Sequence, residues 1–79
     1  MSPDNLYERG WENKIIQQSV LTLPRDERMA ISLFYYFDNS YEKIAVIMEI
    51  PIGTVKSHIH RSKKKLKVIL EPILEKSHE

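Results

Sequence analysis

The stretch IPIGTVKSHIHRSKKKLKVIL, from Ile50 to Leu70, decides the fold of this 79-residue chain. Wound at about 100° per residue, this stretch and the residues just after it place a mostly apolar stripe along one side of a helix. The stripe consists of Val55, Ile59, Ser62, Leu66, Ile69 and Ile73. The opposite side carries Ser57, His60, Arg61, Lys64 and Lys67. The pattern predicts a helix that packs with one face and presents positive charge on the other.

Positive charge is concentrated in this part of the chain. Residues 51–70 hold six of the twelve Lys and Arg residues and no acidic residue, whereas residues 1–50 hold eight acidic residues and five basic ones. A solvated helix surface ordinarily mixes the two signs, so that side chains four residues apart can pair. A face of one sign is typical of binding to a polyanion, or of steering toward one. The net charge of +1 therefore conceals a dipolar chain with a predicted nucleic-acid-binding face.

A turn and a short helix precede the basic helix. Pro51 favours an extended or turn conformation, Gly53 permits a tight bend, and Thr54 can cap the helix N-terminus. Before the turn, Ser40 is well placed as the N-cap of a short helix over residues 41–48. A short helix, a turn of about four residues and a longer basic helix form the helix-turn-helix pattern, in which the second helix enters the major groove of DNA.

Two further helices are predicted before this motif. Apolar residues recur at helical spacing from Trp11 onward, and Pro24 then forces a boundary. Pro24 can begin the next helix, with the acidic side chains of Asp26 and Glu27 near its positive dipole end. The side chains expected on the inner face of that helix are Ala30, Leu33, Phe34 and Phe37. We interpret the aromatic cluster at 34–37 as core packing rather than as a platform for stacking bases.

The chain is expected to form one small all-α domain of four helices, with the helix-turn-helix at its C-terminal end. Residues 1–10 are expected to be a flexible arm, residues 11–72 the domain and residues 73–79 a polar tail, because Pro72 is expected to end the last helix. The sequence has no cysteine, no apolar run of about 18 residues and no basic-then-apolar N-terminal pattern. We therefore expect a cytoplasmic protein with no membrane partner.

Catalysis is not expected from this sequence. His58 and His60 are two residues apart, so on a helix they diverge by about 200° and cannot share a metal ion. The sequence has no Gly-rich phosphate loop, no His-Glu metal motif and no nucleophile with an evident base partner. We expect no metal, no cofactor and no small-molecule substrate.

Most of the chain, from residue 11 to residue 70, resembles region four of bacterial RNA polymerase sigma factors, especially the extracytoplasmic-function (ECF) class. The stretches that carry the resemblance are LPRDERMAISLFYY at 23–36 and SYEKIAVIMEIPIGTVKSHIHRSKKKL at 40–66. The resemblance implies that the last helix reads the −35 element of double-stranded promoter DNA. It also implies that the surface of the other helices grips the flap of the polymerase β subunit, and that an anti-sigma factor is a possible further partner.

The resemblance also suggests which residues contact DNA. The base-reading positions of the family fall on Lys56, Ser57, His60 and Arg61. Phosphate contacts are expected from Thr54, Lys63, Lys64 and Lys67. Lys63 and Lys67 lie toward the edge of the outward face, where the DNA backbone would approach the helix.

Four positions depart from the pattern of that family. Where the family often has Glu, Gly, Arg and Ala, this chain has Lys43, Glu49, His58 and Ser62. Lys43 leaves the capping box of Ser40 incomplete, and His58 removes one expected phosphate contact. Glu49 stands where a helix-ending residue often adopts a positive φ, so we expect its backbone to be strained if it does so.

Two alternatives remain open on sequence grounds. The segment TVKSHI followed by KKL also resembles the LuxR-type DNA-binding output domain, although that family usually has an aliphatic residue in place of Ser62 and Gly in place of Lys67. The other alternative is a protein-interaction module that engages polymerase or an anti-sigma factor and has little intrinsic DNA binding. A complete sigma factor also contains a domain that melts and reads the −10 element, so this chain is expected to be either a fragment or a stand-alone relative.

Overall fold

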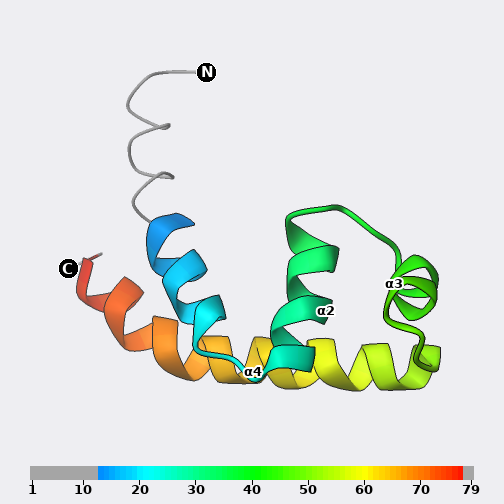
Figure 1. The fold of residues 1–79 in the computed structure, drawn as a ribbon. Coiled ribbons are helices and arrows are strands. Elements are labelled where there is room, and N and C mark those ends of the chain that lie inside the picture. The colour runs from blue at the N-terminus through cyan, green and yellow to red at the C-terminus, as the bar shows by residue number, and fades with distance from the viewer. Residues whose placement is uncertain (1–12, 78–79) are drawn as a thin grey trace.

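The computed structural model describes residues 13–77, and in this range the chain forms helices joined by short turns. The helical segments are residues 13–21, α2 (Arg25–Tyr35), α3 (Tyr41–Met48) and α4 (Ile52–Ser77). α4 forms a long base, and the other three segments lie along one side of it (Figure 1). The prediction of an all-α domain of four helices that ends in a helix-turn-helix is confirmed for the described residues.

Some predictions lie outside the described range: the arm at residues 1–10, the packing of Trp11, and the last two residues of the tail. Within residues 13–77, no helix is both long enough and apolar enough to cross a membrane.

Pro24 separates the first two helical segments, as predicted. Its φ of −54° and ψ of 152° are outside the helical range, while its carbonyl oxygen already accepts a hydrogen bond from the Arg28 N–H at 2.8 Å. Pro24 is therefore the N-cap of α2 rather than its first helical residue, one position from our prediction. Proline has no side-chain acceptor, so no side-chain hydrogen bond caps this helix.

Local hydrogen bonds define both ends of α3. At the start, the Ser40 hydroxyl accepts a hydrogen bond from the Lys43 N–H at 3.1 Å, which confirms the predicted N-cap. At the end, Glu49 has the left-handed conformation, with φ 57° and ψ 45°. The N–H groups of Glu49 and Ile50 donate to carbonyl oxygens in the last turn of α3 at 3.3 and 3.1 Å, which is the Schellman pattern.

α4 begins before Thr54, which we predicted as its N-cap. The N–H groups of Thr54 and Val55 donate to the Pro51 carbonyl oxygen at 3.0 and 3.2 Å, so Pro51 is in the N-cap position and Thr54 is inside the first turn. The prediction that Thr54 caps this helix is wrong, because Pro51, with no N–H to lose and a fixed φ, already suits the helix start. The turn of the helix-turn-helix is residues 49–51.

α4 also extends further than we predicted, since it continues through Pro72 to Ser77. The prediction that the helix ends before Pro72 is wrong, and part of the expected polar tail is helical. A proline inside a helix removes one hydrogen bond, and at an exposed position such as Pro72 water can satisfy the carbonyl that loses its donor. The axis of α4 bends near its red C-terminal end (Figure 1), as expected for a helix that contains proline.

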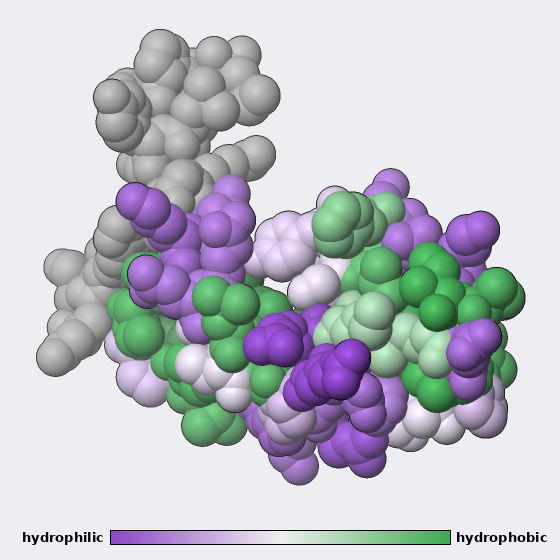
Figure 2. Space-filling model, in the orientation of Figure 1, coloured by the Kyte–Doolittle hydropathy of each residue, from purple (hydrophilic) through white to green (hydrophobic). Residues whose placement is uncertain are grey.

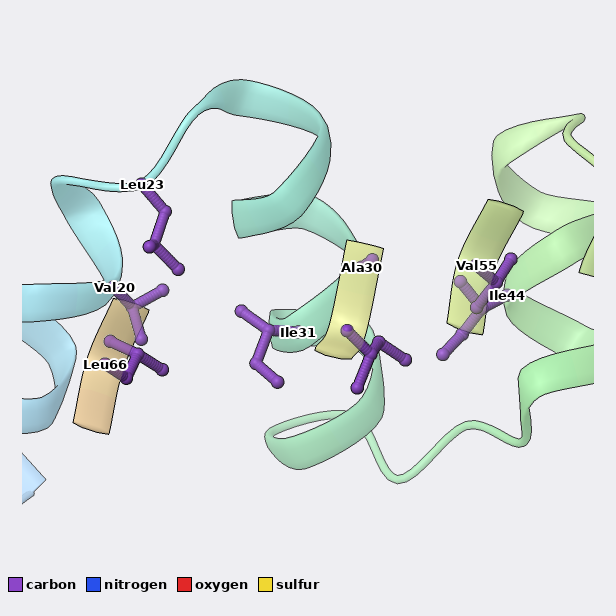
Figure 3. Close-up of a cluster of buried hydrophobic side chains, with 8 residues drawn as sticks. Val20, Leu23, Ala30, Ile31, Ile44, Val55 and Leu66 are labelled. Carbon is purple, nitrogen blue, oxygen red and sulfur yellow. The ribbon is translucent and has the colours of Figure 1, made fainter. Parts of the chain in front are cut away.

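The core lies where the shorter helices meet α4. Its buried apolar side chains are Val20, Leu23, Ala30, Ile31, Ile44, Val55, Ile59 and Leu66. Val20 and Leu66 lie together at one end of this cluster, and Ile44 and Val55 lie together at the other, with Ile31 between the two pairs (Figure 3). All four helical segments contribute members to this cluster. Burial of each large aliphatic side chain contributes about 1.5–3 kcal/mol, so the cluster holds these segments together.

The predicted apolar stripe of α4 is buried in its first part only. Val55, Ile59, Ser62 and Leu66 are each at most 8% exposed. Ile69 and Ile73 are 36% and 39% exposed. The periodic pattern therefore continues beyond the length of α4 that the other described helices cover.

The aromatic cluster at 34–37 packs less than we predicted. Phe34 is partly buried and lies against Tyr41, with ring centroids 5.1 Å apart. Tyr35, Tyr36 and Phe37 are exposed, and Phe37 is the most open at 70%. The prediction that Phe37 lines the inner face of α2 is wrong, because the helix ends at Tyr35 and the helical spacing no longer applies.

Candidate nucleic-acid interface

One side of α4 is open to solvent along the length that the core supports. We call the exposed side chains of Lys56, Ser57, His60, Arg61 and Lys64 the basic face. Hydrophilic side chains gather over the middle of α4, with hydrophobic areas on both sides of them (Figure 2). The structure therefore brings the four predicted base-reading residues together on one solvent-facing surface.

Ser57 has a defined hydroxyl orientation on this face. Its Oγ donates a hydrogen bond to the Gly53 carbonyl oxygen at 3.1 Å, one turn earlier in α4. Because the single hydroxyl hydrogen is used inside the helix, the oxygen lone pairs that remain can only accept. A DNA base that bonds to Ser57 in this conformation would do so through an amino group.

Two of the cations of α4 pair with an acidic residue from another helix. The Arg61 Nε lies 3.3 Å from one carboxylate oxygen of Glu27, and the Lys65 Nζ lies 2.7 Å from the other. The Glu27 side chain is 6% exposed, whereas the side chains of Arg61 and Lys65 are about half exposed. The basic stretch contains no acidic residue of its own, but α2 supplies one that partly neutralises it.

From the sequence, Glu27 was expected only to place an acid near the start of a helix. A second signal was present, because Glu27 precedes the buried Ala30 and Ile31 by three and four residues and so lies on the packed face of α2. An acid on the packed face of one helix, in a chain with a strongly basic helix elsewhere, favours a pair between the two.

The predicted phosphate-contacting residues occupy different surroundings. Lys64 is exposed on the basic face, whereas Thr54 is half-buried in the first turn of α4. The Lys63 Nζ lies 5.5 Å from the ring centroid of Phe34 and 5.8 Å from that of Tyr35, within the range of cation–π attraction. Among the described side chains, the only ion pairs are those of Glu27, so Lys64 is not neutralised by a close acid.

A second surface, which the sequence analysis did not identify, lies beside the basic face. A groove of about 650 Å³ is bounded by helical residues 13–21, α2 and α4. Its apolar lining is Ile16, Val20, Ile31, Leu66 and Leu70, and its other lining residues are Asn13, Gln17, Tyr35, Tyr36, Lys63 and Lys67. Lys63 and Lys67 therefore border both surfaces. Partial burial raises the pKa of Tyr36 above its ordinary value of 10.0, so its hydroxyl stays neutral at physiological pH.

The order α3, short turn, long α4 with an exposed cationic face defines a helix-turn-helix domain of the DNA-binding class. Within that class, residues 13–66 match the sigma-70 region 4 family, and the chain belongs to this family. The family is a region of sigma factors, which are transcription factors of RNA polymerase. The match confirms the resemblance seen in the sequence and favours it over the LuxR-type alternative.

Known proteins with similar sequences are also sigma factors. The chain is 37% identical over 73 residues to the ECF RNA polymerase sigma-E factors of Escherichia coli (strain K12) and of Salmonella typhi, which covers 92% of this chain and 38% of each relative. It is 36% identical over 73 residues to the RNA polymerase sigma-H factor of Pseudomonas aeruginosa, with the same coverage. The chain thus spans 38% of the length of these relatives.

Proposed function

We propose that this chain is the promoter-binding domain of a sigma factor, and that α4 reads the −35 element from the major groove of DNA. The observation that carries this proposal is an exposed basic face on the second helix of a helix-turn-helix, with a buried stripe on the opposite side. The major groove of B-DNA is about 12 Å wide and admits a single helix. Membership of the sigma-70 region 4 family supports the same conclusion.

In this proposal, Lys56, Ser57, His60 and Arg61 contact base edges. Arg61 and Lys56 can donate to guanine acceptors, and the Ser57 oxygen can accept from an amino group. Lys64 and the border residues Lys63 and Lys67, with Thr54 at the start of the helix, hold the phosphate backbone. Phosphate contacts position the helix in the groove but carry no sequence information directly.

We further propose that the groove between helical residues 13–21, α2 and α4 docks on the core of RNA polymerase, at the flap of the β subunit. Its apolar lining and the exposed rings of Tyr35 and Tyr36 support a protein partner, because aromatic side chains are enriched at such interfaces. An anti-sigma factor would compete for the same surface. The alternative of a protein-interaction module would use the same groove, because no residue of the basic face lines it.

The reading function is tested with a duplex that the wild-type chain selects from a randomised pool and with a scrambled duplex of the same composition. Arg61→Ala should weaken binding to the selected duplex by about 1–3 kcal/mol and to the scrambled one by much less. Lys64→Ala should weaken both about equally and reduce the salt slope by about one. If Arg61→Ala weakens both duplexes by the same factor, Arg61 is a phosphate clamp and the assigned reading face is wrong.

The docking function is tested in a gel-shift assay with the same two duplexes, in the presence and absence of polymerase core. Tyr36→Ala should reduce capture of the chain by core polymerase several-fold, because an aromatic anchor at an interface commonly contributes more than 1 kcal/mol. It should leave binding to the isolated duplex unchanged. If the wild-type chain binds DNA only when core is present, the protein-interaction alternative describes this domain better than intrinsic DNA reading does.

A further inference from the structure

Glu27 is joined to three neighbouring positions of α4. Its two carboxylate oxygens lie 3.3 Å from the Arg61 Nε and 2.7 Å from the Lys65 Nζ. Its backbone carbonyl oxygen lies 3.1 Å from the hydroxyl of Ser62, which is fully buried. Glu27 is 5% exposed and belongs to the first turn of α2, outside the helix-turn-helix itself. A carboxylate held this firmly can fix the side chains that bond to it.

The Arg61 guanidinium is held from two sides. The Glu27 carboxylate forms an ion pair with Nε at 3.3 Å, and the Nδ1 of His58 lies 3.1 Å from Nη2, where it can accept a hydrogen bond when the ring carries its proton on Nε2. The two terminal nitrogens, Nη1 and Nη2, carry four N–H donors, and three of these remain after the contact with His58. Donors on these two nitrogens can together bind the two acceptors that guanine presents in the major groove, O6 and N7. Because the Arg61 side chain is 54% exposed, these donors can face a base.

We propose that Glu27 is a positioning residue for sequence reading: it orients the Arg61 guanidinium so that its terminal nitrogens face a guanine. This inference rests on the proposed function of α4. An arginine side chain is long and flexible, and a carboxylate that fixes it before binding reduces the ordering that binding requires. Lys65 offsets the negative charge that Glu27 would otherwise bring near the phosphates.

A purely structural role for Glu27 predicts a different result. The same contacts tie α2 to α4, so substitutions at Glu27 are expected to lower stability as well. Loss of stability alone reduces the fraction of folded protein and weakens binding to every duplex by one factor. Loss of positioning lowers the ratio between binding of the selected duplex and of the scrambled duplex. That ratio is the readout a structural role would not change.

The experiment compares Glu27→Leu and Glu27→Gln with the wild-type chain on the selected and scrambled duplexes. Leucine fills a similar volume but accepts no hydrogen bond, and glutamine keeps one acceptor without the charge. Loss of a two-point base contact lowers discrimination by about 5- to 140-fold. We expect Glu27→Leu to lower the binding ratio at least about fivefold, and Glu27→Gln to give an intermediate value. Asp26→Asn is the matched control, because it removes an exposed carboxylate from the same helical turn, and it should leave the ratio unchanged.

A double-mutant cycle with Arg61→Ala completes the test. In the Arg61→Ala background, Glu27→Leu should change the ratio by less than about twofold, because the side chain that it positions is absent. Thermal unfolding shows whether each variant is folded at the temperature of the titration. If Glu27→Leu is unfolded there, the binding ratio of Glu27→Gln is used in its place. The inference is overturned if a folded Glu27 variant keeps the wild-type ratio between selected and scrambled duplex. It is also overturned if Glu27→Leu lowers that ratio equally with Arg61 present and with Arg61→Ala. In both cases the proposed function stands. A wild-type chain that does not discriminate between the two duplexes overturns both.

Discussion

Two residues of the described chain other than glycine have a positive φ, one in the turn after α2 and one at the C-terminal end of α3. Asp38 follows α2 with φ 54°, and Glu49 follows α3 with φ 57°. Aspartate tolerates the left-handed region better than glutamate does, because its short polar side chain can bond to the nearby backbone. Glu49 is thus the more strained of the two. It occupies the turn that sets the angle between α3 and α4.

We predict that Glu49→Gly stabilises the domain. Glycine removes the steric cost of the left-handed conformation, and its greater freedom in the unfolded chain offsets part of this gain. The free energy of unfolding, measured by urea denaturation, should rise by between a few tenths and about 1 kcal/mol. Glu49→Ala is the control, because it removes the charge but keeps the Cβ, and it should give no such gain. A lower stability for the glycine variant would contradict the left-handed conformation at this position.

At the scale of the helical elements, the packing of α2 on α4 depends on a small side chain. Ser62 is fully buried, and its hydroxyl lies 3.1 Å from the carbonyl oxygen of Glu27 and 2.7 Å from that of His58. One hydroxyl has one hydrogen, so the two carbonyl oxygens share it. Its short side chain also lets α2 lie close to α4, where a larger one would not fit.

We predict graded effects at this position. Ser62→Ala loses the hydrogen bond between the helices and should lower the free energy of unfolding by about 0.5–1.5 kcal/mol. Ser62→Val adds volume at the crossing and should cost about 1–3 kcal/mol. Thermal or urea unfolding of the two variants measures this order. If valine is tolerated better than alanine, the crossing is looser than the buried contacts indicate.

Capping residues, apolar periodicity and proline positions predicted both ends of α3 correctly but neither end of α4. Ser40 offers a side-chain acceptor, and the apolar pattern of 41–48 stops at the turn, so both ends of α3 could be predicted from the sequence. For α4, we assigned Pro51 to the turn and the N-cap to Thr54, although proline suits the start of a helix at Pro51 as it does at Pro24. Pro72 was expected to stop the helix, but its effect depends on whether solvent reaches the position, which the sequence does not show.

The candidate site was predicted only in part, because local spacing defines the exposed face of a helix but not its contacts with other helices. The helical period placed Ser57, His60 and Lys64 on the outward face, because periodicity depends only on spacing along one helix. The ion pairs of Arg61 and Lys65 with Glu27 link residues 34 and 38 positions apart, and no local pattern contains them. The groove beside α2 likewise arises only when three helical segments meet. The sequence thus predicted the face but not the contacts that orient its side chains.

At the scale of the whole molecule, the concentration of positive charge in residues 51–70 predicts that DNA affinity depends strongly on salt. If α4 docks in the major groove and about five phosphates are neutralised, the slope of log K against log salt should be roughly −4 to −5, because counterions are released from the DNA. Titration of the selected duplex at several salt concentrations measures this slope. Lys14→Gln removes an exposed cation from helical residues 13–21, away from the basic face, and should leave the slope unchanged. Binding that does not depend on salt would contradict docking in the groove.

α4 is one continuous helix of 26 residues, and both proposed surfaces are built on it. The basic face and Leu70, at the far end of the groove, are separated by up to about 20 Å along the axis, at 1.5 Å per residue. Over that length a tilt of about 5° displaces the reading end by roughly 2 Å, which is enough to break a hydrogen bond to a base. In the proposed function, α4 would therefore couple the two surfaces mechanically. A partner bound in the groove would change the angle at which the other end of α4 meets the bases, without touching DNA itself.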